Sequence, residues 1–132
     1  MTTTTTTLTP ANVVASATNT AGSTTRGTRD MRGKHGGLLT LKITNGATGP
    51  TVQCEGRVLV AHNSGSTPTA ASAGADWKTI FSFGGGTTNN AVTEQHIVLP
   101  PCCHVEVEFT GNTAQSVTVE SVITDYTDLQ TA

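Results

Sequence analysis

Aromatic and charged residues are both scarce in this chain of 132 residues, which suits a single domain by size. Aromatic side chains make up 4% of the sequence, so a core has to be built mainly from Val, Leu and Ile, and we expect it to be thin. A thin core favours additional stabilisation from oligomerisation or from a partner. Charged residues make up 12% and the formal net charge is −2, which argues against a protein that binds nucleic acid strongly.

Cysteine is also rare, and its three positions (Cys54, Cys102 and Cys103) include an adjacent pair. An odd number with two neighbours does not suit the disulfide framework of a small secreted domain. We therefore expect buried free thiols in a reducing compartment. The sequence shows no apolar run of the roughly 18–20 residues that would span a bilayer, and no signal-peptide pattern at its start. These absences predict no membrane partner and folding in a cytoplasm.

Alternation of apolar and polar residues, by contrast, is frequent and predicts strands. Leu39, Leu41 and Ile43 alternate with polar residues before the turn signal Asn45-Gly46. The same alternation in residues 51–62 places five residues on one face of a predicted strand: Val52, Cys54, Gly56, Val58 and Val60. Six segments follow this pattern: 38–46, 51–62, 77–83, 94–100, 104–112 and 116–126.

One or two further strands are expected nearer the N-terminus, the first over 12–18. No stretch has the 3.6-residue period of an amphipathic helix. The sequence therefore predicts an all-β fold, a β-sandwich or jelly roll of about seven to eight strands.

The N-terminal tract MTTTTTTLTPAN is low in complexity and rich in threonine. Branching at Cβ disfavours helix and favours an extended backbone, yet ordering each residue costs about 1–2 kcal/mol. We therefore predict an arm and linker over 1–29, followed by the sandwich over 30–132. The arm is expected to gain its shape by adding to the edge of another subunit's sheet. Its predicted partner-binding residues are Thr2, Thr3, Thr4, Thr5, Thr6, Thr7 and Leu8.

Charge is distributed unevenly along the chain. Four cations, Arg26, Arg29, Arg32 and Lys34, fall within nine residues, whereas no Lys or Arg follows Lys78. The basic segment (these four residues) is predicted to dock on an acidic face of a neighbouring copy or of another protein. The alternative is that it lies across acidic strands of its own domain. Nucleic acid is disfavoured, because four cations in a net negative chain are a weak electrostatic footprint.

Catalytic and metal-binding patterns are weak. Cys102, Cys103 and His104 are adjacent, but neighbouring side chains on a strand point to opposite faces and cannot easily reach one ion. Glu106 and Glu108 alternate with valines, which is typical of a solvated strand face. The GGG at 84–86 lacks the Lys-Ser/Thr of a phosphate loop and is interpreted as a hairpin connection. We expect no enzyme, no cofactor, no metal and no small-molecule substrate.

Three stretches carry a resemblance to a known family: GKHGGLLTLKITNG, ADWKTIFSFGGGT and HVEVEFTGNTAQSVTVES. Together they resemble the capsid decoration, or cement, proteins of tailed bacteriophages over roughly residues 30–125. The resemblance implies a sandwich bound to the outside of an icosahedral head, as trimers or dimers. Its role would be to hold neighbouring major capsid subunits together. It carries no catalytic residues.

Two alternatives stay open from the sequence. Endings similar to GNT…VTV also occur in phage tail and neck proteins, which would place the protein elsewhere in the virion. A carbohydrate-binding module for host attachment is the other, although such modules usually stack sugars on exposed aromatic rings. Here only Trp77 and Tyr126 are strong candidates for that stacking.

Overall fold

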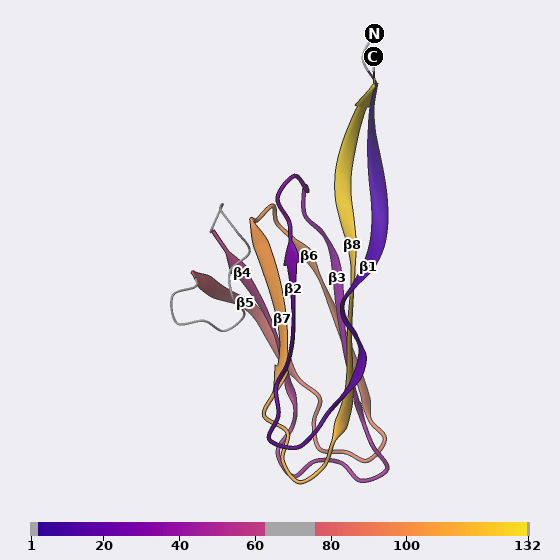
Figure 1. Cartoon of the computed structure of the whole chain (residues 1–132). Helices are drawn as coiled ribbons and strands as arrows, with labels where there is room; N and C mark the ends of the chain where they lie inside the picture. Colours follow the sequence, from indigo (N-terminus) through magenta and orange to yellow (C-terminus); the bar gives the residue numbers. More distant parts are fainter. Residues whose placement is uncertain (1–2, 63–75, 132) are drawn as a thin grey trace.

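The chain folds into eight β-strands in a computed structural model that describes residues 3–62 and 76–131 (Figure 1). No helix occurs among these residues, and hence none long and apolar enough to cross a membrane. The predicted all-β class is confirmed. The strands are β1 (Thr3–Asn19), β2 (Thr25–Asp30), β3 (Gly37–Asn45), β4 (Glu55–Ala61), β5 (Trp77–Gly84), β6 (Val92–Leu99), β7 (His104–Thr110) and β8 (Val117–Thr131).

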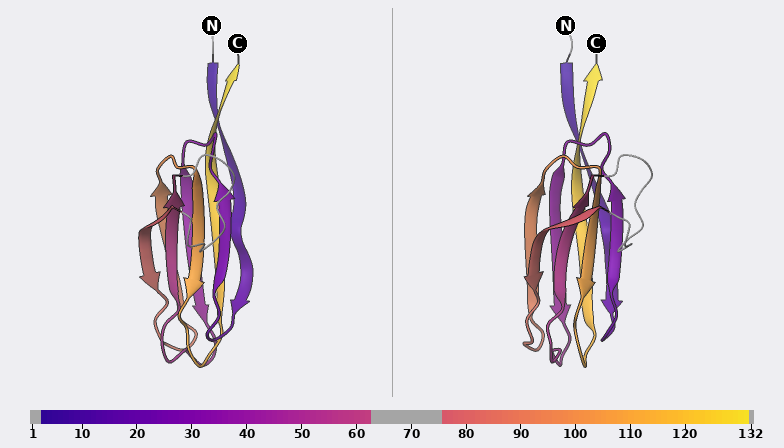
Figure 2. Two further views of the ribbon diagram at one scale, coloured as in Figure 1. Left: turned by 60° about the vertical axis from the view of Figure 1, so that its left-hand side comes forward. Right: turned by 90° about the vertical axis from the view of Figure 1, so that its left-hand side faces the viewer.

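The strands form two four-stranded antiparallel sheets that pack face to face, as the views in Figure 2 show. One sheet has the order β1-β8-β3-β6 and the other β2-β7-β4-β5. The chain passes repeatedly from one sheet to the other, so strands adjacent in sequence are often in different layers. This arrangement is the predicted β-sandwich.

The core lies between the two sheets and follows the predicted alternation. Leu39, Leu41 and Ile43 of β3 are fully buried, and they belong to one apolar cluster with Val107 and Phe109 of β7. Burying each such side chain contributes roughly 1.5–3 kcal/mol relative to leaving it exposed. The period-two pattern was therefore a sound guide to the inward face of these strands.

The sandwich is tightly closed along the side where β1 and β2 lie. A Cβ atom added to Gly27 of β2 would lie 1.9 Å from the backbone oxygen of Val13 in β1. Real Cβ atoms do not approach an oxygen so closely, so only glycine allows the two backbones this contact. β1 therefore packs closely against the inner face of β2 on this side of the sandwich.

Three sequence interpretations need correction. Residues 3–29, expected as arm and linker, include β1 and β2, which are hydrogen-bonded members of the two sheets. Val52, assigned to an inward strand face, lies before β4 and is 53% exposed. Glu106 and Glu108 are buried rather than solvated, because β7 is an interior strand flanked by β2 and β4.

Candidate attachment site

β1 and β8 extend past the rest of the sandwich as a two-stranded ribbon (Figure 1). β3, the other neighbour of β8, begins at Gly37, which pairs with Asp125. Beyond that point β8 pairs only with β1, from Leu8↔Tyr126 to Thr3↔Thr131. We call residues 3–8 and 126–131 the ribbon. Among the described strands, each ribbon strand has one neighbour, so the outer backbone groups of residues 3–8 and 127–131 are open to a further strand.

The threonine-rich arm is therefore ordered, but not by another subunit. The predicted partner strand was the sheet edge of a neighbouring molecule, whereas Thr3–Thr7 pair with the chain's own C-terminal strand. β-branched residues favour the extended backbone of this ladder. Leu8 on the ribbon is 59% exposed, so the projecting element presents an apolar side chain at its surface. Thr2 lies outside the described residues.

A clasp formed by the β2–β3 connection holds the root of the ribbon. The backbone N–H of His35 donates to the carbonyl of Tyr126 at 2.7 Å, and the N–H of Tyr126 donates to the carbonyl of Gly36 at 3.0 Å. An isolated two-stranded hairpin is marginally stable in water. These bonds continue the ladder by one residue past the start of β3 and tie the ribbon to the body.

A buried ion pair lies directly beneath this clasp. Asp125 of β8 is fully buried, and its Oδ2 accepts a hydrogen bond from Nε of Arg29 at 2.9 Å and a second from Arg29 Nη2. The ammonium nitrogen of Lys34 lies 3.8 Å from the same oxygen. A buried carboxylate without such partners would be strongly destabilising. Asp125 and these cations therefore anchor β8 where the ribbon begins.

The other two cations of the basic segment are also paired within the domain. Arg26 donates from Nε to Glu108 at 2.8 Å, and the opposite side of that carboxylate lies 3.5 Å from Nη1 of Arg57. Arg32 hydrogen-bonds the exposed Asp30, and this guanidinium holds the pKa of the Asp30 carboxyl well below its usual range. The alternative in which the basic segment pairs with acidic groups of its own domain is thus confirmed.

Cys102, Cys103 and His104 lie at the same end of the sandwich as the clasp but form no reactive centre in the described structure, and Cys54 lies at the opposite end, just before β4. The backbone N–H of Met31 donates to the carbonyl of Cys103 at 2.9 Å, which joins the β2–β3 and β6–β7 connections. His104 is fully buried, with Nε2 3.8 Å from a carboxylate oxygen of Asp30. Burial raises the pKa of the Cys102 thiol, so it stays protonated and weakly nucleophilic. Among described residues, no three His, Cys, Asp or Glu side chains converge as metal ligands.

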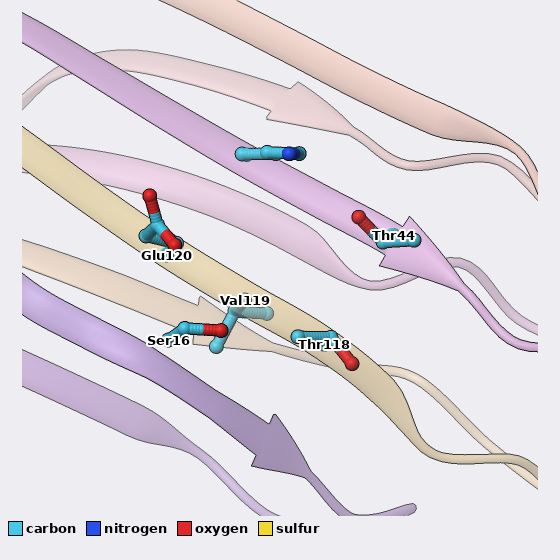
Figure 3. A pocket seen from close by; sticks show the side chains of 6 residues that line it. Ser16, Thr44, Thr118, Val119 and Glu120 are labelled. Atoms are coloured by element: carbon cyan, nitrogen blue, oxygen red, sulfur yellow. The ribbon is translucent and has the colours of Figure 1, made fainter.

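A small hollow lies on the outer face of the β1-β8-β3-β6 sheet (Figure 3). Its volume of about 50 Å³ is far below the few hundred Å³ of a typical ligand site. Its side chains come from three adjacent strands: Ser16, Lys42, Thr44, Thr118, Val119 and Glu120. Lys42 and Glu120 are directly opposite in the β3–β8 ladder, so their charges compensate each other. The hollow is large enough for ordered water rather than for a sugar.

The structure thus brings Arg29 and Lys34 of the basic segment to the root of the ribbon, which contains the predicted arm, whereas Arg26 pairs with Glu108 towards the other end of the sandwich. Asp125 is the residue that links Arg29 and Lys34 to the ribbon, and the sequence interpretation gave it no role. A signal for it was present, because Asp125 continues the inward series Val117, Val119, Ser121 and Ile123 at a spacing of two. A carboxylate at such an inward position requires a cation nearby.

No family model and no curated protein matches this sequence. Among solved structures, the K1 cleaved adhesin domain of Lys-gingipain from Porphyromonas gingivalis W83 aligns with a TM-score of 0.52 at 12% identity, covering 92% of this chain and 89% of that one. The SPBc2 prophage-derived protein YomS aligns at 0.43 and 19% identity, covering 91% and 95%. Infectious bursal disease virus VP2 aligns at 0.47 and 9% identity, covering 92% and 33%. The structural similarity to the K1 adhesin domain supports the fold class. At these sequence identities, similarity to a solved structure concerns the fold alone.

Proposed function

We propose that this protein is a non-enzymatic structural component of a bacteriophage particle, bound on the outer surface of the head, where it cements neighbouring major capsid subunits. The observation that carries the proposal is the ribbon, which projects beyond the compact body with both backbone edges open. Such an element buries little of its own surface and is suited to adding a strand to a neighbouring protein. The sequence resemblance to phage decoration proteins supplies the nature of that neighbour.

The attachment element in this proposal is the ribbon rather than the basic segment. Arg26, Arg29 and Arg32 already have carboxylate partners within the domain. Docking them on another acidic surface would require these pairs to break, and the pair beneath the clasp is buried. The outer backbone groups of the ribbon need no such exchange. The basic segment therefore contributes to attachment only indirectly, because its ion pairs with Asp125 orient β8.

The test uses a variant that lacks residues 2–8 and 127–132 together, so that neither ribbon strand is left without its partner. Tyr126, Asp125 and the clasp are retained, and a cooperative thermal transition checks that the body folds. Binding to empty heads of the phage that encodes the protein is measured by co-sedimentation after a salt wash. We expect the full-length protein to remain on the heads and the variant to be lost.

Val52→Ser is the matched control, because this exposed side chain lies in the β3–β4 connection, which follows the end of β3 farthest from the ribbon. It should leave head binding unchanged. Equal retention of the ribbon-deleted variant would show that the ribbon is not the attachment element. Gold-labelled antibody that marks the neck or tail instead of the head would overturn the capsid assignment. Labelling of no part of the particle would overturn the structural role itself.

A further inference from the structure

Within the body of the sandwich, outside the ribbon, three of the four sheet edges in the described structure carry features that discourage pairing with another strand. β1 has Pro10 and two shifts of register against β8. β2 is the shortest of the four edge strands, with six residues, and it carries Arg26 and Arg29. β5 has a register shift against β4 and carries Lys78. Bulges, proline, basic side chains such as lysine, and short strand length are usual means by which natural sheets protect their edges.

β6 has none of these protections. Its eight residues, Val92–Leu99, pair with β3 in one unbroken register, and they include no proline, glycine or lysine. Two apolar side chains on its outward face are widely exposed, Val92 at 57% and Val98 at 72%. Val98 lies directly opposite Leu38, which is itself 39% exposed. A long, regular and partly apolar edge of this kind is a site for strand pairing.

The sequence of β6 is complementary to itself when read in the opposite direction. In an antiparallel pair centred on Gln95, Val92 of one copy faces Val98 of the other, and Glu94 faces His96. The same two contacts recur on the other side of the centre, because a twofold interface repeats each of them. Paired residues also lie on the same face of the sheet, so outward side chains meet outward ones.

We propose that two copies of this chain associate through β6, antiparallel and centred on Gln95, to join their β1-β8-β3-β6 sheets into one sheet of eight strands. The rows of side chains on β3 then continue across the interface. Leu38 and Val98 are followed by the partner's Val92, and Lys42 and Glu94 by the partner's His96. The apolar contacts are at the two ends of the pairing and the charged contacts at its middle.

A second copy fits this edge better than an unrelated strand does. Glu94 and His96 would disfavour pairing with a generic apolar strand, since each side chain needs a complementary polar side chain at the facing position of that strand. The chain itself supplies both groups at the required spacing, together with a valine opposite each valine. The same two polar side chains that disfavour pairing of β6 with other proteins therefore favour pairing with the β6 edge of a second copy.

The geometry has a consequence for the ribbon. The twofold axis of such a pair is perpendicular to the sheet, and β1 and β8 are on the side of the sheet away from β6. The two ribbons would then extend from opposite ends of the dimer. If the ribbon is the attachment element, the dimer has two of them, and a molecule held at two points dissociates far more slowly than one held at a single point.

Sedimentation velocity on the purified full-length chain over a wide concentration range tests the association without any phage component. We expect a monomer–dimer equilibrium. Val98→Lys places a cation opposite Val92 twice per interface and should weaken dimerisation by about tenfold or more. Ile80→Lys is the matched control, since Ile80 is an equally apolar side chain, 42% exposed, on the β5 edge of the other sheet. It should leave the dimerisation constant unchanged.

A swap of two residues tests the register. The single change His96→Glu places a second carboxylate opposite the partner's Glu94 and should weaken the dimer. The double variant Glu94→His, His96→Glu again places a histidine opposite a glutamate across the interface and should recover the dimerisation constant. Failure of the double variant to recover would overturn the Gln95-centred register. A chain that stays monomeric throughout, or an effect of Ile80→Lys equal to that of Val98→Lys, would overturn the β6 interface. None of these results depends on head binding.

Discussion

Arg29 and Asp125 are 96 positions apart in the chain and yet form a buried pair, with Arg29 Nε 2.9 Å from a carboxylate oxygen of Asp125. The pair connects β2 of one sheet with β8 of the other. It lies where β8 leaves the sandwich to form the ribbon, so it joins the two layers and anchors the projecting element at a single point.

Replacing Asp125 with Asn should destabilise the fold, because it leaves Arg29 and Lys34 without their counter-charge. A broken buried pair costs about 3–5 kcal/mol, and we expect about 1–3 kcal/mol here since Arg29 is partly exposed. Urea unfolding followed by circular dichroism gives the value. Asp30→Asn is the control: its pair with Arg32 is on the surface and should make no measurable difference. Equal midpoints for both variants would contradict the anchoring role.

Stability should fall at alkaline pH because of Cys54. Burial raises the pKa of this thiol to about 11, from an ordinary value of 9.0. Above pH 9 the unfolded chain loses the thiol proton while the folded chain keeps it, so unfolding is favoured progressively until about pH 11. The loss attributable to Cys54 is at most about 3 kcal/mol.

The measurement for Cys54 is the free energy of unfolding between pH 8 and pH 11, in reducing buffer, for the wild type and Cys54→Ala. The variant should start less stable, owing to the lost core volume, but show a shallower decline. Parallel curves for the two proteins would exclude a contribution from this thiol.

Gly27→Ala should destabilise the protein by more than about 2 kcal/mol (an order-of-magnitude expectation for a steric clash in a packed region). The added methyl group would overlap the backbone oxygen of Val13, and one of the two strands would have to move. Gly46→Ala is the control, because the nearest atom to a Cβ there is 3.9 Å away. Thermal melts compare the two. A neutral Gly27→Ala would show that β1 is not held against β2 as described.

Amide hydrogen exchange should be faster in the ribbon than in the body. Residues 3–8 have a strand on one side only and project from the sandwich, whereas Val14 is buried within it. Exchange by local fraying requires little energy in such an element. Mass spectrometry of peptic fragments from 3–8 and 11–19 gives the comparison. Equal protection in the free protein would mean that another contact covers the ribbon.

Much of the fold was predictable because it depends on local pattern. The alternation in β3 and β7 identified the inward faces, and Asn45-Gly46 marked the end of β3. Val52 fell outside its expected strand because the same alternation continues into a connection. A strand was expected over 12–18, but residues 1–29 were assigned to an arm and linker, since threonine and glycine provide little of the apolar signal that shows which strands belong to the body.

The candidate site was predictable only in part. The arm and the basic segment were both noticed, but the partners of the arm, of Arg26 and of Arg29 were not, since they are on β7 and β8, at least 82 positions away. Glu108 was assigned to the solvent for the same reason. Its burial depends on Arg26 and Arg57, which come from two different neighbouring strands.

The amino-acid sequence by itself determined that this chain is all-β, with a valine- and leucine-based core and a β-branched, extended N-terminal tract. These properties follow from side-chain branching and from a repeat of two, both of which act over a few residues. Tertiary structure decided which strand pairs with which, and so it decided that the threonine tract pairs with its own chain and that Asp125 meets Arg29. It also decided that, among the described strands, the β6 edge of one sheet is left without a neighbouring strand. These outcomes depend on the free energies of contacts between distant segments, and such energies cannot be inferred from the pattern of a few neighbouring residues.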